Sequence, residues 1–362
     1  MATMLRPPAE LAYADELATL ARTDGGPKPP GWRLSPLAVK AFVCGDAKRG
    51  IARKFYGDDT LVERAIVSLA GTRGLLLVGE PGTAKSMLSE LLAAAISGNS
   101  THTIQGSAGV SEDQVKYSWN YALLLAEGPT PRALVPSAIY TGMRDGVLVR
   151  FEEITRCAPE IQDALIGILS EKMLIVPELP GDDRVLLATP GFNVIATANT
   201  RDRGVHEMSS ALKRRFNFET VSPIRDINLE IALVQQECAR LLAEAAAPVT
   251  VERPVVELLV TAFHDLREGV TAEGIQLEKA AAVMSTAEAV SVALSAGLDC
   301  HYFGTGMLTP EFICRHLATA MTKDAQGEEK KLKHYFDIVV TQRSKSKGGI
   351  WTDFLKARKW LA

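Results

Sequence analysis

The feature that most constrains this chain is a short apolar run followed by a glycine-rich turn that ends in lysine and serine. Residues 75–78 are all apolar and predict a buried strand, and residues 87–96 have the apolar spacing of a helix. Between them lies the turn Gly-Glu-Pro-Gly-Thr-Ala-Lys-Ser, residues 79–86. Strand, glycine turn, Lys-Ser and helix, in this order, are the parts of a phosphate-binding P-loop. The pattern therefore predicts an α/β fold that binds phosphate where the strand meets the helix.

Each part of this loop has a predicted role in binding ATP. Backbone N–H groups of the turn and the positive end of the helix would hold the phosphates. Lys85 would reach the outer phosphates, and the Ser86 hydroxyl would ligate Mg²⁺. Ala84 stands where the general pattern has glycine, and the alternative is a glycine-rich turn with a chance lysine. The predicted nucleotide-binding residues of the loop are Gly79, Glu80, Pro81, Gly82, Thr83, Ala84, Lys85, Ser86 and Met87.

Composition narrows the class of protein. A chain of 362 residues suits two or three domains, and a net charge of −3 gives no global attraction to nucleic acid or membrane. The five cysteines are odd in number and without C-x-x-C spacing, which argues against a disulfide framework or a zinc site. No signal segment or membrane-length apolar run is present. We therefore expect a cytoplasmic protein without a membrane partner.

The chain before the P-loop offers one further candidate for nucleotide binding. Residues 9–22 predict a helix, residues 23–31 a breaker-rich linker, and residues 51–70 a helix that leads into the P-loop strand. Within the last segment, Phe55, Tyr56 and Gly57 stand where many P-loop ATPases place residues around the adenine. The alternative, equally weighted, is that the two aromatic residues belong to the core.

An apolar strand ending in two acids forms a second motif. Residues 147–153 read Val-Leu-Val-Arg-Phe-Glu-Glu, which is a Walker B pattern interrupted by Arg150. Glu152 would hold Mg²⁺ through water, in place of the usual aspartate, and Glu153 would polarise the attacking water. The alternative is a strand followed by a solvated acidic turn.

The region between the two motifs and the region after them complete the α/β pattern. Residues 101–105 predict a strand, and residues 106–146 a long irregular insertion, which in a compact domain is usually functional. A helix over 158–171 and a hairpin over 173–187 precede a buried strand over 192–199. That strand ends in Asn199, at the carboxyl edge where open α/β sheets bind ligands. Asn199 would orient the hydrolytic water, and the alternative is a turn-capping asparagine.

Two arginines form the last candidate pair. Lys213, Arg214 and Arg215 close a helix before a short strand over 218–221. Adjacent cations at a helix end are usually solvated and interact with the helix dipole. The functional alternative is an arginine that reaches the γ-phosphate of a neighbouring subunit.

The rest of the chain predicts only helices, over 228–246, 251–268, 277–295 and 309–322. Residues 323–362 hold ten Lys/Arg against five Asp/Glu and end in an amphipathic segment. These charges read as a solvated basic face. We expect four parts: an N-terminal extension (1–50), a nucleotide-binding domain (51–223), an all-α lid (224–322) and a basic tail with a terminal helix (323–362).

Taken together, the motifs resemble the AAA+ ATPases. The segments GEPGTAKS, VRFEEITRCAPEIQDALIGILSE, VIATANT and ALKRRF occur in this order and are similar to those of the MoxR group, a branch with an insertion in helix 2. The resemblance implies a P-loop core with a parallel sheet flanked by helices, followed by a small all-α lid. In that group the P-loop commonly has alanine at the position of Ala84.

The resemblance also assigns roles residue by residue. Glu152 takes the metal-side place and Glu153 the catalytic place, while Asn199 becomes the sensor 1 residue. Arg215 aligns with the trans-acting arginine finger, and Arg214 is the adjacent candidate. The insertion over 106–146 and the hairpin over 172–188 would face a partner or a ring pore. The lid segment over 285–288 lacks the sensor 2 arginine of the group, which puts the coupling of the lid to the γ-phosphate in doubt.

Three functions follow, in order of preference. The first is a hexameric ATP hydrolase that remodels, assembles or activates a protein partner, for which the resemblance implies a protein with a von Willebrand A domain. The second is a nucleotide-gated binding switch with little turnover, motivated by Glu152 and the missing lid arginine. The third is a DNA-acting motor, which the near-neutral charge argues against.

Overall fold

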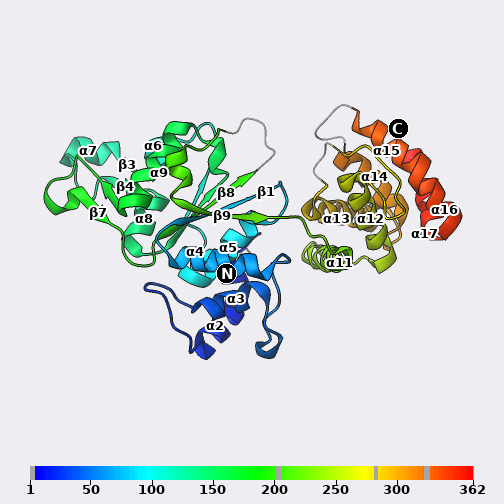
Figure 1. Ribbon diagram of the computed structural model, residues 1–362, viewed down its shortest axis with the longest axis horizontal. Helices are drawn as coiled ribbons and strands as arrows, with labels where there is room; N and C mark the ends of the chain where they lie inside the picture. The colour runs from blue at the N-terminus through cyan, green and yellow to red at the C-terminus, as the bar shows by residue number, and fades with distance from the viewer. Residues whose placement is uncertain (1–4, 200–205, 281–283, 322–326, 362) are drawn as a thin grey trace. The chain divides into compact units, whose positions relative to one another are not determined.

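The computed structural model describes residues 5–199, 206–280, 284–321 and 327–361. The chain divides into two compact units (Figure 1). The N-terminal unit comprises Met1–Glu80 and Ala84–Ser222, and the C-terminal unit comprises Pro223–Ala362 with Pro81–Thr83. Among the described residues, no helix combines the length and the apolarity needed to cross a bilayer.

A five-stranded sheet forms the centre of the N-terminal unit, in the order β2-β5-β8-β1-β9, and each neighbouring pair is parallel. Both faces of such a sheet are normally covered by helices, and its strands are then apolar throughout. The parallel sheet with helices on both faces confirms the predicted α/β fold class. The strands are β1 Gly74–Gly79, β2 Thr103–Gln105, β5 Leu148–Glu152, β8 Asn193–Asn199 and β9 Phe216–Val221.

Alternate side chains of the strands enter two separate cores. Leu75 and Leu77 of β1 pack in one cluster with the N-terminal helices, while Leu76 packs in the other. Likewise, Leu148 of β5 points to the first core, and Val149 and Phe151 point to the second. This alternation follows from the two-residue period of a strand. It also decides which side chains of β5 face the P-loop helix.

Helices of the N-terminal unit lie on both faces of the sheet. The first core contains residues of α2–α5, and the second contains residues of α6, α8, α9 and α10. The helices are α1 Ala9–Ala12, α2 Ala14–Thr23, α3 Pro36–Cys44, η1 Ala47–Arg49, α4 Asp59–Ala70, α5 Lys85–Ser97, α6 Glu112–Val115, α7 Tyr121–Glu127, α8 Ala138–Asp145, η2 Ile154–Arg156, α9 Pro159–Glu171, η3 Gly181–Arg184 and α10 Ser210–Lys213.

Three sequence-based expectations for this unit need correction. The helix predicted over 9–22 is broken at Tyr13, and the helix predicted over 51–70 begins only at Asp59, where Asp58 caps it by accepting from the Thr60 N–H at 2.9 Å. The insertion expected to be irregular contains α6, α7, α8 and a two-stranded sheet of β3 Tyr117–Trp119 and β4 Leu134–Pro136. The predicted hairpin is confirmed as β6 Met173–Ile175 paired with β7 Val185–Leu187.

The C-terminal unit is all helical in its described elements. Three of the four predicted helices are confirmed within about two residues, which is the usual uncertainty of helix ends. Of the segment expected as a helix over 277–295, residues 281–283 lie outside the described part of the chain, residues 277–280 and 284–285 are not helical, and the helix begins at Thr286, where the Ser285 side chain accepts from the Glu288 N–H at 3.2 Å. The elements are α11 Ile227–Glu244, α12 Arg253–Glu268, α13 Thr286–Phe303, α14 Pro310–Met321, α15 Glu328–Tyr335, the π-helix η4 Phe336–Val340, α16 Thr341–Lys347, α17 Ile350–Lys356 and η5 Ala357–Trp360.

The described residues of the terminal segment, 327–361, contribute to the core of this unit. Tyr335, Phe336, Trp351 and Phe354 belong to one apolar cluster with residues of α11–α14. Their amphipathic pattern therefore reflects burial against the preceding helices of the same unit.

A buried arginine fixes this terminal segment. Arg343 of α16 is 2% exposed, and its guanidinium donates to Asp265 Oδ2 and to Glu273 Oε2, both at 2.6 Å. The Tyr335 hydroxyl also donates to Asp265, and the guanidinium lies 4.7 Å from the ring centre of Trp351. Burial raises the pKa of the Asp265 carboxyl, even though the bonds from Arg343 oppose this shift.

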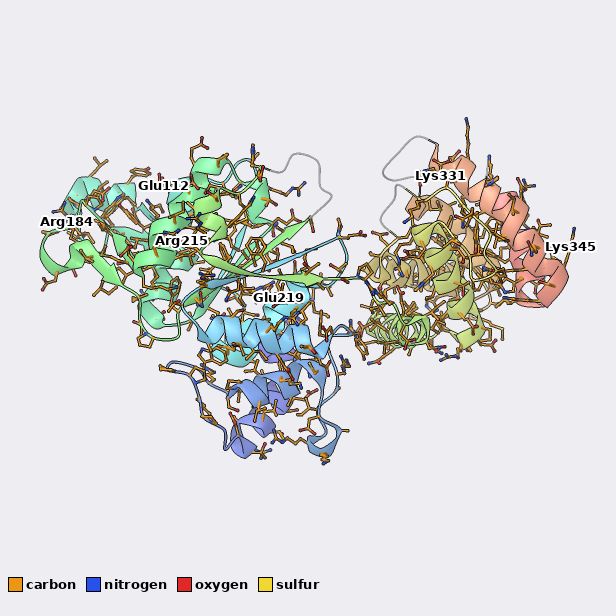
Figure 2. All side chains as sticks on the ribbon, in the orientation of Figure 1. Glu112, Arg184, Arg215, Glu219, Lys331 and Lys345 are labelled. Carbon is orange, nitrogen blue, oxygen red and sulfur yellow. The ribbon has the colours of Figure 1, made fainter. Side chains whose placement is uncertain are left out.

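The first prediction concerns this buried ion pair. We expect Arg343→Ala to lower the free energy of unfolding of the C-terminal unit by about 3–5 kcal/mol, because it leaves the Asp265 carboxylate buried without its cation. Urea denaturation followed by tryptophan fluorescence measures the loss. Lys345→Ala is the matched control, since Lys345 projects from the same helix into solvent (Figure 2). Equal stability of the two variants would contradict the assignment.

The turn between β1 and α5 contains a residue with a strained backbone conformation. Ala84 has φ +64° and ψ +24°, the left-handed region that a side chain disfavours. This backbone requirement explains why glycine is the general residue at this position.

The second prediction follows from that dihedral angle. Ala84→Gly should raise the free energy of unfolding by less than about 1 kcal/mol, because relief of a penalty of about 1–2 kcal/mol is partly offset by the greater freedom of glycine in the unfolded chain, about 0.4–1 kcal/mol. Thermal and urea denaturation measure the change. The same substitution at Ala164, inside α9, should destabilise by about 1 kcal/mol. A loss of stability at both positions would be inconsistent with a strained Ala84.

Candidate functional site

The P-loop joins the carboxyl end of β1 to the amino end of α5. The N-cap residue of α5 is Ala84, whose side chain makes no hydrogen bond to the first N–H groups of the helix. Gly82 and Ala84 both have positive φ, which curls the loop in front of these donors. The arrangement is the one that binds an anionic oxygen at a helix start.

The lysine of the loop points into this curl. Lys85 is 6% exposed, and its ammonium donates to the backbone oxygens of Gly79 at 3.1 Å and Glu80 at 2.7 Å. The ammonium group is therefore held at the base of the loop, where it could donate to phosphate oxygens instead with little movement of the side chain.

Glu152, the predicted metal-side acid, lies next to the serine of the loop. The Ser86 hydroxyl donates to Glu152 Oε2 at 2.7 Å, and the Thr197 hydroxyl of β8 donates to the same oxygen at 2.8 Å. The other oxygen, Oε1, accepts from the Ser89 hydroxyl at 2.6 Å and from Arg150 at 2.8 Å. Burial raises the pKa of the Glu152 carboxyl, but the bonds from Ser89 and Ser86 and the charge of Arg150 outweigh it, so the pKa lies below its usual value.

These groups fit a hydrated Mg²⁺ ion. No cluster of three or more His, Cys, Asp or Glu side chains suited to a metal occurs among the described residues. Mg²⁺ bound with nucleotide needs no such cluster, because it keeps several waters and takes one or two protein oxygens plus phosphates. The adjacent Ser86 hydroxyl and Glu152 carboxylate supply that minimal oxygen set.

Glu153 occupies a special backbone position just beyond β5. It has φ +53°, and its N–H donates to the Thr197 hydroxyl at 2.9 Å. Its half-buried carboxylate accepts from Arg156 at 2.8 Å. Gly106 packs against this turn so closely that a Cβ there would lie 2.2 Å from the Glu153 backbone oxygen. The turn thus directs the two acids to different surroundings, one buried and one accessible.

Asn199 lies at the same edge of the sheet. It is the last residue of β8 and is paired in register with Gly79, the first residue of the P-loop. The structure therefore brings together Lys85, Ser86, Glu152 and Asn199 at the carboxyl ends of adjacent strands, where open α/β sheets bind ligands.

The two arginines lie far from that edge. Phe216, which follows Arg215, is paired with Gly74, so Arg215 is level with Arg73. Gly79 lies six residues further along β1, which is about 20 Å at ~3.3 Å per residue. Arg215 (Figure 2) donates to the Ser170 hydroxyl of α9 at 2.7 Å and to the Ala211 backbone oxygen at 3.1 Å. The neighbouring Arg214 is exposed.

The candidate adenine residues divide between the two interpretations. Phe55 is 2% exposed and belongs to the first core, as the core interpretation has it. Tyr56 is half-buried with the Arg53 guanidinium 6.0 Å from its ring centre. A Cβ at Gly57 would lie 2.4 Å from the Phe55 ring, so glycine permits the chain to turn over that ring.

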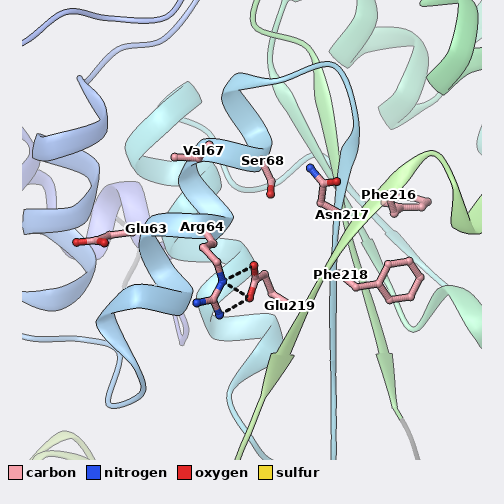
Figure 3. A pocket seen from close by; sticks show the side chains of 8 residues that line it. All are labelled: Glu63, Arg64, Val67, Ser68, Phe216, Asn217, Phe218 and Glu219. Atoms are coloured by element: carbon pink, nitrogen blue, oxygen red, sulfur yellow. Dashed lines mark hydrogen bonds and ion pairs between the residues drawn. The ribbon is translucent and has the colours of Figure 1, made fainter.

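A hollow elsewhere on the N-terminal unit contains none of the candidate residues. It lies between α4 and β9 and is lined in part by Val67 and Phe218 (Figure 3). Arg64 spans it, with Nε and Nη2 donating to the Glu219 carboxylate at 2.8–3.1 Å. This bidentate pair ties α4 to β9, which has a strand neighbour on only one side.

The lid helix α13 begins without an arginine of its own, as the sequence predicts. The guanidinium of Arg267, from α12, lies against this start and donates to the Met284 backbone oxygen at 3.1 Å. It also approaches the buried carboxylate of Glu230, which accepts from the Thr286 hydroxyl at 2.6 Å. The start of α13 is thus held by a polar cluster inside the C-terminal unit.

Sequence reasoning missed four residues that complete the site: Ser89, Thr197, Arg156 and Arg150 as a partner of Glu152. Ser89 lies on the same face of α5 as Ser86, because residues three apart are neighbours on a helix. That spacing was the available signal for Ser89. The contact of Thr197 depends on the order of the strands, which the sequence alone does not reveal.

Comparison with protein families and solved structures agrees with this geometry. The AAA domain family of the dynein-related subfamily matches residues 74–216, and the YehL-like AAA+ ATPase C-terminal domain matches residues 228–362. A crystal structure of NtrX from Brucella abortus in complex with ATP superposes with a TM-score of 0.51 at 9% identity, covering 85% of this chain and 70% of that chain. This likeness supports the fold.

Relatives in sequence extend the match to nearly the whole chain. A Staphylococcus aureus (strain USA300) protein described as uncharacterized is 29% identical over 46% of this chain and 62% of its own length. The protein YehL of Escherichia coli K12, also described as uncharacterized, is 50% identical over 98% of this chain and 97% of its own length. The chain therefore belongs to the YehL-like family of AAA+ ATPases.

Proposed function

We propose that this protein binds and hydrolyses Mg-ATP as a ring oligomer, a hexamer in the MoxR-like arrangement, and uses the cycle to remodel, assemble or activate a protein partner. The observation that carries the proposal is the position of Arg215 at the opposite end of the sheet from its own P-loop. A second requirement, a surface for a protein partner, is supported by the apolar exposure of the insertion and the β6–β7 hairpin.

Within one subunit, the carboxyl edge of the sheet supplies the groups for phosphoryl transfer to water. The P-loop N–H groups and Lys85 would hold the phosphates, and Ser86 with Glu152 would hold Mg²⁺. Bound Mg²⁺ neutralises charge that develops on the phosphate oxygens. Glu153 would accept a proton from the attacking water, and Asn199 would orient that water.

In this proposal the arginine finger, which would stabilise charge on the transferred phosphate, comes from another subunit. A single side chain is much shorter than the ~20 Å that six strand residues span, so Arg215 cannot reach along β1 to the phosphates of its own subunit. Its guanidinium is held by Ser170 and Ala211 at the surface of the unit, where a neighbouring copy could bring its own nucleotide. This position supports action in trans.

The insertion and the hairpin present apolar side chains to solvent. No residue of α7 is buried, although its sequence is Tyr-Ala-Leu-Leu-Leu-Ala-Glu, and Leu125 is 90% exposed. In the hairpin, Ile175 is paired with Val185 and Met173 with Leu187, so these side chains share the face opposite the buried Leu174. Both features lie at one end of the N-terminal unit (Figure 1). Contiguous exposed apolar surface marks protein interaction sites.

The third prediction tests action in trans by mixing variants. Lys85→Ala and Arg215→Ala should each be nearly inactive, since an arginine finger contributes about 10³–10⁵-fold to turnover. A mixture of the two should regain activity, because some interfaces then pair an intact P-loop with an intact Arg215. Steady-state phosphate release, measured against protein concentration and mixing ratio, gives the result.

Lys213→Ala is the matched control for the mixing experiment, because it removes a nearby cation, paired with Glu207 at 2.7 Å, that is not a candidate arginine finger. Sedimentation of every variant with nucleotide would establish that assembly is intact. Turnover that does not depend on protein concentration, and a mixture no more active than its components, would exclude the ring mechanism.

A nucleotide-gated switch with little turnover is the second candidate function. It is favoured by the ion pair between Arg156 and Glu153, which occupies one oxygen of the proposed catalytic base. In this alternative the pair would keep hydrolysis slow, and ATP binding alone would change the affinity for the partner.

The fourth prediction separates the two functions. Under the hydrolase proposal, Glu153→Gln should retain Mg-ATP binding and lose about 10²–10⁴-fold in phosphate release. The control is Glu160→Gln, an exposed glutamate at the start of α9, which should leave both quantities unchanged. If the wild-type protein binds ATP but releases almost no phosphate, with or without partner, the switch is the better description.

A further inference from the structure

Arg150 interrupts the apolar run of β5, and its side chain is nearly buried. Because side chains alternate along a strand, Leu148, Arg150 and Glu152 all face α5, while Val149 and Phe151 enter the opposite core. The Arg150 side chain is 11% exposed and the Glu152 side chain 6%. Burying a charged side chain is unfavourable unless its donors are hydrogen-bonded, so the contacts of the guanidinium indicate why an arginine stands at this position.

The guanidinium makes four contacts, three of them with Glu152 or with the two serines that bond Glu152. Its Nε donates to the Ser89 hydroxyl at 3.0 Å, and Nη2 donates to Glu152 Oε1 at 2.8 Å. Nη2 also reaches the Ser86 backbone oxygen at 3.1 Å, and Nη1 reaches the Ser100 backbone oxygen at 3.1 Å. Arg150 thus joins the acid, the first turn of α5 and the end of the segment after α5.

These contacts divide the two carboxylate oxygens of Glu152 between two tasks. Arg150 and Ser89 occupy Oε1, so Oε2 is directed to the hydroxyls of Ser86 and Thr197. Glutamate has one more rotatable bond than aspartate, and without Arg150 only the hydroxyls of Ser86, Ser89 and Thr197 would restrain that bond. The bond to the Ser86 backbone oxygen fixes the other half of the pair.

We propose that Arg150 is a positioning residue, which aims Glu152 Oε2 at Ser86 and thereby sets the affinity of the site for Mg²⁺. This inference rests on the proposed function of the P-loop edge as a Mg-ATP site. In this arrangement Glu152, Arg150 and Ser89 act together. Glutamate can replace the usual, shorter aspartate because Arg150 holds its second carboxylate oxygen.

The test compares nucleotide binding with and without Mg²⁺ by calorimetry, and so does not depend on turnover. Arg150→Met keeps the length of the side chain but not its hydrogen bonds. We expect the Mg²⁺ concentration that half-saturates ATP binding to rise by about 10–100-fold, because loss of an outer partner of a metal ligand usually lowers metal affinity by this factor. ATP binding in EDTA should be unchanged. Arg150→Lys, which keeps one donor and the charge, should recover part of the loss.

A double-mutant cycle decides whether Arg150 acts through Glu152. In a Glu152→Gln background the further change Arg150→Met should cost little, because the two residues serve one task. Additive losses, or an unchanged Mg²⁺ half-saturation in Arg150→Met, would overturn the proposal. If Arg150→Met does not fold, the comparison of Arg150→Lys with wild type in both backgrounds gives the same answer.

Two controls separate this role from a merely structural one. Asn193→Leu removes another buried polar side chain, which donates to backbone oxygens of Leu69 and Arg73 at the other end of the sheet, and should lower stability without changing Mg²⁺ half-saturation. Arg144→Met, on the surface of α8, should change neither. If wild-type protein shows no Mg²⁺-dependent ATP binding at all, the proposed function fails rather than the role of Arg150.

Discussion

The hydrogen bonding of the buried Glu152 carboxylate is the interaction on which the rest of the candidate site, at the carboxyl edge of the sheet, depends. A charge placed there would be strongly unfavourable without partners, and its four hydrogen bonds come from three different elements. Ser86 and Ser89 belong to α5, Arg150 to β5 itself and Thr197 to β8. Satisfying one acid therefore fixes the P-loop helix against two central strands. The position of Glu153 follows, because its N–H donates to the same Thr197 hydroxyl that bonds Glu152.

Parallel strand register then separates the groups of the site into two sets. Asn199 is level with Gly79, whereas Arg215 is level with the residue before Gly74. One end of the sheet thus gathers the phosphate-binding and acidic groups, and the other carries a cation that cannot reach them within the subunit. The same arrangement that concentrates the site at one edge makes it incomplete in a single copy under the proposed mechanism. This is a consequence of strand direction, and it does not depend on how the two units of the chain are placed.

The sequence predicted those parts of the structure whose signals are local. Strand, turn and helix of the P-loop lie next to one another in the chain, so their order alone identified them, and the apolar periods of β8 and α9 did the same. Contacts between distant segments could not be read in this way. Arg150 looked like an interruption because its partner Ser89 is 61 residues away. The terminal helices looked like a basic tail because the charged face is visible in the sequence, whereas the burial of Arg343 against Asp265 is set by the fold.

Helix α9 connects the two ends of the proposed cycle. It begins just after the turn that holds Glu153 and Arg156, and its last turn carries Ser170, which bonds Arg215 at 2.7 Å. Strand β6, with its exposed apolar face, follows directly after Lys172, so a helix about 20 Å long separates Glu153, the proposed catalytic base, from the hairpin. Packed helices move as rigid bodies, because their cores resist continuous deformation. Under the proposed function, a change of the Glu153–Arg156 pair that displaced α9 would therefore move Arg215 and the exposed apolar face of the hairpin together. In the proposed cycle, one helix with a charged contact at its start and an apolar hairpin at its end would be enough to couple hydrolysis to a partner.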